Sequence, residues 1–266
     1  MRVLKDIPYG NHERHTVDIF IPENIKNESG LIFYIHGGGW TSYDKTVHHP
    51  DCEHFAKLGY ICATTNYRYV DGNTIIDDLL DDITQAIGKV KELCIESGFN
   101  TEKILLSGGS AGAHLALMYA YTRKDKSPLT PVCVCAYCPA VKLETTDFLM
   151  GISGEFEEWK FGVLSACCGL KVNRETLLCE EQQAALKRVS PYYYVDENTV
   201  PTAIFHGRKD ELVPFEHATL LINLLNEKGV ENDFLVYENS GHAQDKDPEK
   251  AIEAKEIIEK YACKYF

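Results

Sequence analysis

The sequence predicts an α/β fold in which a mainly parallel sheet of about eight strands carries helices on both faces. Three observations support this prediction. Strand and helix patterns alternate from residue 30 onward, which favours parallel strands joined by right-handed crossovers. The segments 30–35 and 132–137 read as buried strands, as expected where helices cover both faces. With 266 residues, of which 44% are apolar, the chain can bury the core of a single domain.

Two strands are expected before this alternation begins, at residues 2–8 and 15–21. In the second, apolar residues at odd positions alternate with Asp18 and Phe20, which is typical of a partly solvated antiparallel strand. Three more strands are expected at 60–66, 201–205 and 233–237, and helices at 48–58, 214–228 and 248–264.

The strongest helix pattern runs from residue 74 to 98. Apolar residues recur every three or four positions, Asp77 and Asp78 stand in the first turn, and Gly98 ends the pattern. Six acidic residues lie between Asp77 and Glu96. We expect them to form a solvated face rather than a metal site.

Residues 103–121 contain a strand, a glycine-serine turn and a helix in direct succession. At their centre, Gly108 to Gly112 matches the pattern G-x-S-x-G. In such a turn the serine backbone is strained, and glycine two residues before and after leaves room for the strand and helix to approach. The Ser110 hydroxyl would then project from the carboxyl end of the strand. Without this strand-helix context, a plain tight turn would be an equal interpretation.

Two further catalytic candidates follow predicted strands. Asp210 comes after the strand at 201–205 and His242 after the last strand, so the chain order is serine, acid, histidine. Serine needs an imidazole to remove its proton, and the imidazole needs a carboxylate to fix its tautomer. Glu211 is the rival acid next door, and Glu238 a more distant one.

Three consecutive glycines follow the buried strand at 30–35, in the segment from His36 to Trp40. Glycines here can expose backbone N–H groups that bind an anion. A flexible loop is the alternative interpretation.

Residues 141–190 break the alternation, because they hold short helical pieces and no convincing buried strand. We expect a cap-like insertion over the strand ends, within a single domain spanning 1–266. Insertions at that edge commonly shape the substrate pocket. Its aromatic and apolar side chains could face the substrate or pack within the cap: Phe148, Met150, Phe156, Trp159 and Phe161.

Composition and charge exclude several function classes. A net charge of −13 without any basic run argues against a nucleic-acid partner. A secretory signal needs an unbroken apolar segment, which Lys5 and Asp6 interrupt. No segment of the sequence has an apolar run long enough to span a membrane. The sequence therefore predicts a cytoplasmic protein with no membrane partner.

Ten cysteines could indicate disulfides, a metal site or core packing, and we expect Cys133, Cys135, Cys138, Cys167 and Cys168 to be small buried thiols. Without an export signal, disulfides are not expected. Cys133, Cys135 and Cys138 stand close together but lie in an apolar strand without a matching ligand pair at zinc spacing. No metal and no cofactor are expected.

Taken together, several motifs carry a family resemblance. They are His36-Gly37-Gly38-Gly39-Trp40, Asn66-Tyr67-Arg68, Gly108-Gly109-Ser110-Ala111-Gly112, His206-Gly207-x-x-Asp210 with Val213-Pro214, and Gly241-His242. With these motifs the chain resembles α/β-hydrolase esterases of the hormone-sensitive-lipase type, in the branch of small acetyl-xylan and feruloyl esterase-like (BD-FAE-type) proteins. The motifs span residues 36 to 242, most of the chain.

The resemblance implies a role for each matching residue. Ser110 would be the nucleophile, His242 the general base and acid, and Asp210 the residue that orients it. The oxyanion donors would be the N–H groups of Gly38, Gly39 and Ala111, with His36 holding the glycine loop. Apart from these roles, we expect substrate contacts from Trp40 and Tyr67 and, on the insertion, from Trp159.

The sequence thus predicts a serine carboxylesterase acting on short-chain, acetyl or aryl esters of small molecules. The short N-terminus leaves little for a lid besides residues 141–190, which argues against long-chain lipids. A peptidase or amidase of the same fold, and a hydrolase-like binding protein without catalysis, are the alternatives. A homodimer is one assembly that the sequence allows.

Overall fold

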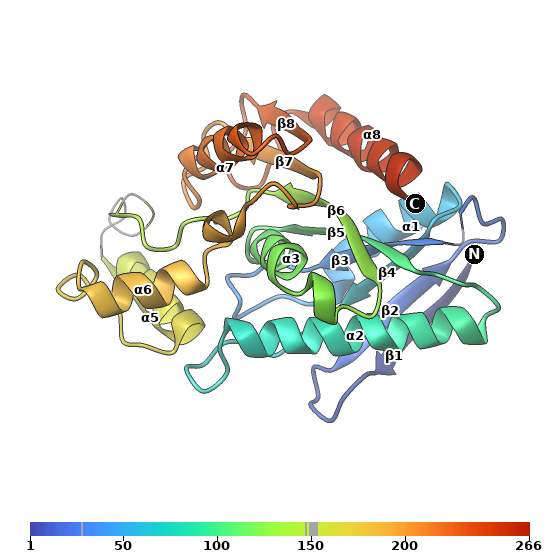
Figure 1. The fold of residues 1–266 in the computed structure, drawn as a ribbon, viewed down its shortest axis with the longest axis horizontal. Coiled ribbons are helices and arrows are strands. Elements are labelled where there is room, and N and C mark those ends of the chain that lie inside the picture. The colour runs from blue at the N-terminus through green and yellow to red at the C-terminus, as the bar shows by residue number, and fades with distance from the viewer. Residues whose placement is uncertain (28, 147, 149–153) are drawn as a thin grey trace.

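The computed structural model describes residues 1–27, 29–146, 148 and 154–266 (Figure 1). A sheet of eight strands forms its centre, in the order β1-β2-β4-β3-β5-β6-β7-β8. The strands are β1 Arg2–Pro8, β2 Thr16–Ile21, β3 Gly30–Ile35, β4 Ile61–Thr65, β5 Lys103–Gly109, β6 Thr130–Tyr137, β7 Thr202–Gly207 and β8 Asn232–Tyr237. β2 pairs antiparallel with β1 and β4, and every pair from β4 to β8 is parallel. The predicted fold class is confirmed.

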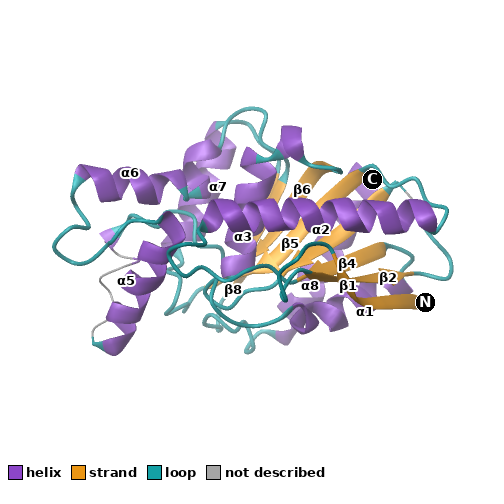
Figure 2. Cartoon of the chain, turned by 90° about the horizontal axis from the view of Figure 1, so that it is seen from below, coloured by secondary structure: helices purple, strands orange, loops and turns teal. Residues whose placement is uncertain are grey.

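Helices cover both faces of this sheet. On one face, α1 His49–Lys57 and α8 Pro248–Tyr265 pack in one apolar cluster. On the other, α2 Ile76–Glu96, α3 Ala111–Thr122 and α7 Glu216–Glu227 belong to a second. α2 lies across the sheet in Figure 2. In the described part of the chain, no helix has the length and apolar character needed to span a membrane.

Two further helices, α5 Glu155–Cys168 and α6 Glu180–Arg188, fall between β6 and β7 in the chain. Figures 1 and 2 show them beyond one end of the sheet, apart from the helices that cover its faces. Short 3₁₀ segments complete the elements at Lys45–His48, Lys124–Lys126 and Pro191–Tyr194.

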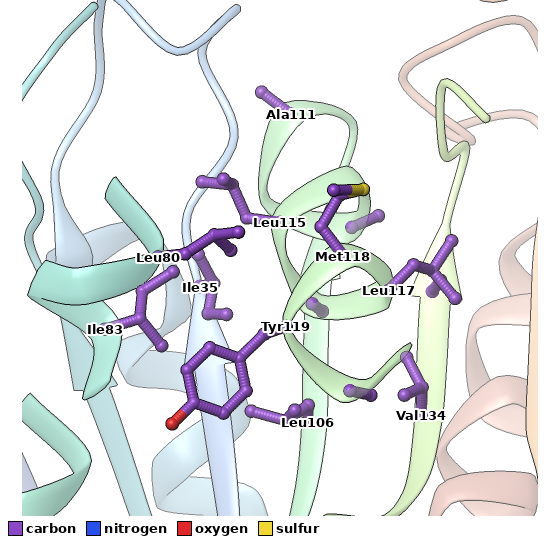
Figure 3. Packing of buried hydrophobic residues seen from close by; sticks show 14 of the residues in the cluster. Ile35, Leu80, Ile83, Leu106, Ala111, Leu115, Leu117, Met118, Tyr119 and Val134 are labelled. Carbon is purple, nitrogen blue, oxygen red and sulfur yellow. The ribbon is translucent and has the colours of Figure 1, made fainter. Parts of the chain in front are cut away.

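α3 is enclosed by its neighbours because its sequence is apolar on nearly every side, which is typical of a fully buried helix. Leu80 of α2 packs beside it, and Leu106 of β5 and Val134 of β6 lie on the sheet side (Figure 3). Buried packing of this kind leaves little freedom of movement. The residue at the N-terminus of α3, Ser110, therefore sits on a rigid support.

Two predictions about acidic residues are wrong. β2 is antiparallel, but it is buried rather than partly solvated, and Asp18 is 1% exposed. Its carboxylate lies 2.7 Å from His49 Nε2 and 3.4 Å from Lys45 Nζ. On α2, Asp82 belongs to no solvated face, since it is fully buried and 2.7 Å from Arg68 Nη2. In both cases a basic partner offsets the burial of the charge.

The burial predicted for five of the cysteines is confirmed, whereas Cys179 and Cys263 are exposed. All ten cysteines lie among the described residues and none forms a disulfide. Cys133, Cys135 and Cys138 are buried, as are Cys167 and Cys168.

Candidate active site

Ser110 occupies a strained turn between β5 and α3. Its φ of 54° and ψ of −118° cost energy for a residue with a side chain. The surroundings hold it there, because Ser110 N–H donates to Tyr137 O at 2.7 Å and its carbonyl accepts from His114 N–H at 2.9 Å. Gly112 is required for close approach, since a Cβ there would lie 2.0 Å from Ile35 O.

This crowding predicts that Gly112→Ala lowers the free energy of unfolding by about 3 kcal/mol, the upper end for overpacking, because a backbone oxygen cannot swing aside. Gly109→Ala is the matched control, since no atom lies within 4 Å of a Cβ at that glycine. Urea denaturation of both variants measures the difference. Equal stabilities would contradict the close packing of β3 against α3.

Asp210 and His242 meet although 32 residues separate them. Asp210 Oδ2 lies 2.7 Å from His242 Nδ1, while Oδ1 accepts the N–H groups of Leu212 and Val213, each at 2.9 Å. The rival acid Glu211 is exposed. The more distant one, Glu238, bonds Arg208, with 3.0 Å between Oε1 and Nη2. Of the three candidate acids, the structure places Asp210 against the imidazole.

A second histidine also faces this carboxylate. His206 is fully buried, and its Nε2 lies 2.9 Å from Val213 O and 3.2 Å from Asp210 Oδ2. Burial acts to raise the pKa of Asp210, but hydrogen bonds from His206, His242 and Val213 N–H outweigh it and hold that pKa well below its usual range. The carboxylate therefore stays ionised at neutral pH and can fix the His242 ring by its Nδ1–H.

The depressed pKa of Asp210 makes a prediction for stability. Because the folded pKa lies below the unfolded value of about 3.9, the unfolded chain binds the proton first as pH falls. Asp210 thus stabilises the fold above pH 4 and loses this contribution at lower pH. We expect the melting temperatures of wild type and Asp210→Asn to differ at pH 7 and converge toward pH 2.5 in calorimetry. A constant difference would contradict it.

Ser110 and His242 line one pocket of about 450 Å³. Within residues 1–27, 29–146, 148 and 154–266, no hydrogen bond joins the serine hydroxyl to the ring. The structure thus joins Asp210 to His242 by a hydrogen bond. It brings Ser110 to the same cavity, but without a hydrogen bond between its hydroxyl and the His242 ring. Catalytic hydrogen bonds are often long in proteins without bound substrate.

The glycine loop forms another wall of the pocket. A Cβ at Gly37 would lie 2.7 Å from Gly109 O and 3.6 Å from Ser110 Cβ, so the loop runs beside the serine. Gly38 and Gly39 have φ values of 97° and 58°, a region that favours glycine. Both glycines line the pocket, and among the described residues their N–H groups are free of a backbone partner there.

Ala111, the third predicted donor, is the first residue of α3 and is itself buried. N–H groups in the first helical turn lack a partner within the helix. Its N–H follows Ser110 directly, while its side chain does not line the pocket.

His36 holds the glycine loop through its ring and its carbonyl. Nδ1 lies 2.8 Å from Gly37 O, and Nε2 lies 3.2 Å from Arg14 Nη2. Burial lowers the pKa of His36 to about 4, so the ring is neutral at pH 7. With Arg14 as a donor to Nε2, Nδ1 carries the proton and donates to Gly37 O.

Two of the three predicted substrate contacts line the pocket. Trp40 is nearly buried and its Nε1–H donates to His114 Nδ1 at 3.2 Å. Trp159 is 45% exposed, and its indole would be 3.0 Å from a Cβ at Gly39. The prediction that Tyr67 contacts the substrate is wrong. Tyr67 is fully buried, does not line the pocket and donates its hydroxyl hydrogen to His36 O at 2.6 Å. It supports the loop instead.

The aromatic residues of the insertion divide in the same way. Phe148 and Phe156 line the pocket, and Phe156 stacks on Trp159 with ring centroids 5.3 Å apart. Phe161 packs into the apolar core. Met150 lies outside the described residues.

Lys160 is a pocket residue that the sequence reasoning missed. The sequence signal that could have identified it is its position between two aromatic residues, Trp159 and Phe161. A lysine in such a place is commonly interpreted as a solvated position, and only the packing of α5 shows that it is buried.

One cluster of metal-ligand type is found in the described part of the chain. It consists of Cys138, His206 and Asp210, whose ligand atoms lie within 4.8 Å of one another. Asp210 already accepts hydrogen bonds from His242, Leu212 and Val213, and burial raises the pKa of the Cys138 thiol well above its usual value. The cluster is therefore better suited to holding an ionised carboxylate by hydrogen bonds than to binding a metal ion, because a cysteine binds metal as the thiolate.

Comparison with known proteins places this geometry in a family. The chain is 27% identical over 231 residues to the probable carboxylic ester hydrolase LipM of Mycobacterium tuberculosis, covering 84% of this chain and 51% of that protein. It is 25% identical over 265 residues to the probable isoprenylcysteine alpha-carbonyl methylesterase ICME of Oryza sativa subsp. japonica, covering 91% and 58%. The chain thus spans about half the length of the curated relatives it matches.

Among solved structures, esterase B from Lactobacillus rhamnosis HN001 superposes with a TM-score of 0.78 at 17% identity, covering 98% of this chain and 85% of that one. The likeness shows that the sheet and its helices form the α/β-hydrolase fold. The BD-FAE family model matches residues 17–225, which include the glycine loop, Ser110 and Asp210. By this match the chain belongs to the BD-FAE family.

Proposed function

We propose that the protein is a serine carboxylesterase, with Ser110 as nucleophile, His242 as general base and acid, and Asp210 as the orienting carboxylate. The observation that carries the proposal is the 2.7 Å contact of Asp210 with His242, in the pocket that also holds the strained serine. The names of the relatives LipM and ICME, an ester hydrolase and a methylesterase, support it.

In the proposed reaction, Ser110 attacks the ester carbonyl while His242 Nε2 takes its proton. The negative charge that develops on the carbonyl oxygen is stabilised by the N–H groups of Gly38, Gly39 and Ala111. His242 then protonates the departing alcohol. Water, activated by the same imidazole, releases the acid and restores the serine.

The proposed substrates are esters with a short acyl group, such as acetyl, or with an aryl group. A pocket of about 450 Å³ is near the lower end of the range for small-molecule sites. We propose that residues 141–190 act as the cap within one domain, since Phe148, Phe156 and Trp159 supply one wall of the cavity. A cytoplasmic location and a homodimer stay predictions.

The test compares three probes of the purified protein. We expect labelling by a fluorophosphonate and faster turnover of p-nitrophenyl acetate than of an aminoacyl anilide. Faster anilide cleavage would favour the peptidase alternative. A folded protein that resists the fluorophosphonate would favour a binding protein without catalysis.

A further inference from the structure

Lys160 on α5 is a buried cation in the wall of the active-site pocket. The residue is only 6% exposed, which is rare for a lysine. Nζ donates to two backbone carbonyls, Phe148 O at 2.8 Å and Leu212 O at 2.9 Å. It also lies 4.3 Å from the Phe148 ring centroid. One ammonium group therefore ties α5 to two other segments, one of which follows β7.

The contact with Leu212 lies beside Asp210, the proposed orienting carboxylate. The N–H groups of Leu212 and Val213 both donate to Asp210 Oδ1 at 2.9 Å, and Asp210 Oδ2 lies 2.7 Å from His242 Nδ1. Lys160 thus fixes one side of the loop whose other side holds the carboxylate. Resting on the proposed function, we propose that Lys160 is a positioning residue that acts through this loop to keep Asp210 aimed at His242.

The charge on Lys160 strengthens both carbonyl contacts, since hydrogen bonds from an ionised donor are about twice as strong as neutral ones. No described carboxylate forms an ion pair with its Nζ. Glu157, one turn earlier on α5, pairs with Arg174 instead. The carbonyl dipoles and the Phe148 ring are its immediate partners.

Burial lowers the pKa of Lys160 to about 8, although the charge of Asp210 acts in the opposite direction. From α7, His217 also faces this region, but burial lowers its pKa to about 3, so it carries no charge at neutral pH. The ammonium therefore loses its proton near pH 8, while Asp210 stays ionised and His217 stays neutral.

Loss of the Lys160 proton as pH rises should lower activity but raise the stability of the fold. Above pH 8 the neutral amine bonds the carbonyls more weakly, so activity should decline. The folded pKa of about 8 lies below the unfolded value of about 10.4, so the unfolded chain binds more protons between these values. Through Lys160 alone, stability rises with pH over this window. A decline in activity between pH 8 and about 10.4 therefore cannot be explained by unfolding that Lys160 causes.

The experiment compares Lys160→Met and Lys160→Arg with wild type, and uses Lys187→Met as a control at an exposed position on α6. We expect kcat for p-nitrophenyl acetate to fall between about 10- and 100-fold in Lys160→Met, the range for a displaced catalytic group. Lys160→Arg should retain most activity and lose the decline above pH 8, because arginine does not titrate there. The control should match wild type.

A second readout does not depend on catalysis. The His242 Nδ1 proton, held by Asp210, should give a far-downfield proton NMR signal in wild type and Lys160→Arg, and a weaker or absent one in Lys160→Met. If wild type lacks esterase activity but the signal follows Lys160, the proposed function fails and the positioning role stands. Unchanged signal and activity in Lys160→Met would overturn the inference. So would a loss confined to esters that carry a carboxylate, because Lys160 would then contact the substrate.

Discussion

Replacing Ser110 with alanine is expected to reduce kcat for short esters by about 10⁵–10⁶-fold, the scale seen when a serine hydrolase loses its nucleophile. No other hydroxyl stands at the turn between β5 and α3, where the backbone at φ 54° and ψ −118° presents the side chain to the pocket. Stopped assays with p-nitrophenyl acetate and labelling by a fluorophosphonate measure the effect. The variant should take up no label.

The fold of this variant should be unaffected. Ser110 is held through its backbone, by its N–H to Tyr137 O and its carbonyl to His114 N–H, and alanine keeps both bonds. Circular dichroism and the melting temperature should therefore match wild type. Ser107→Ala is a control serine on the same strand, since its hydroxyl bonds Cys135 O in the core. Equal losses of activity in both variants would contradict the role of Ser110.

The second large effect is expected for Asp210→Asn, with a loss of about 10⁴-fold in kcat. The loop N–H groups of Leu212 and Val213 would keep the amide oxygen at the Oδ1 position. The amide NH₂ would then face His242, whose Nδ1 could only accept from it. That arrangement moves the ring proton to Nε2, so the imidazole cannot take a proton from serine.

Glu211→Gln is the matched control for this substitution, because it makes the same change of charge one residue away at an exposed position. We expect it to retain kcat within about twofold of wild type, as is usual for surface changes away from the chemistry. A larger loss in Glu211→Gln than in Asp210→Asn would reverse the assignment of the acid. Initial rates at pH 7 for both variants decide between them.

Much of the fold could be predicted because its signals are local. The strand at Gly30–Ile35 matches the predicted range, and the helix at Ile76–Glu96 lies within the predicted 74–98. Apolar runs and helical periodicity report burial directly. Asp18 and Asp82 show the limit of such local patterns. A buried acidic residue whose basic partner is far away in the chain looks the same in sequence as a solvated one.

The candidate site divides in a similar way. Glycines around Ser110 and the loops that carry Asp210 and His242 are visible as motifs, because backbone strain and strand ends restrict which residues fit. Tyr67 could not be placed by its motif. Its distance from the pocket depends on how β4 packs beside β3, and the structure puts it under the glycine loop, bonded to His36 O.

The sequence alone determined the α/β class, the order of the elements and the serine turn, because each depends on interactions between residues close together in the chain. Only the tertiary structure decided that Asp210 rather than Glu211 meets His242, that Asp18 and Asp82 are buried, and that Lys160 reaches the Asp210 loop. These outcomes depend on the distance and direction between side chains far apart in sequence. Such distances are fixed by packing, which no local pattern encodes.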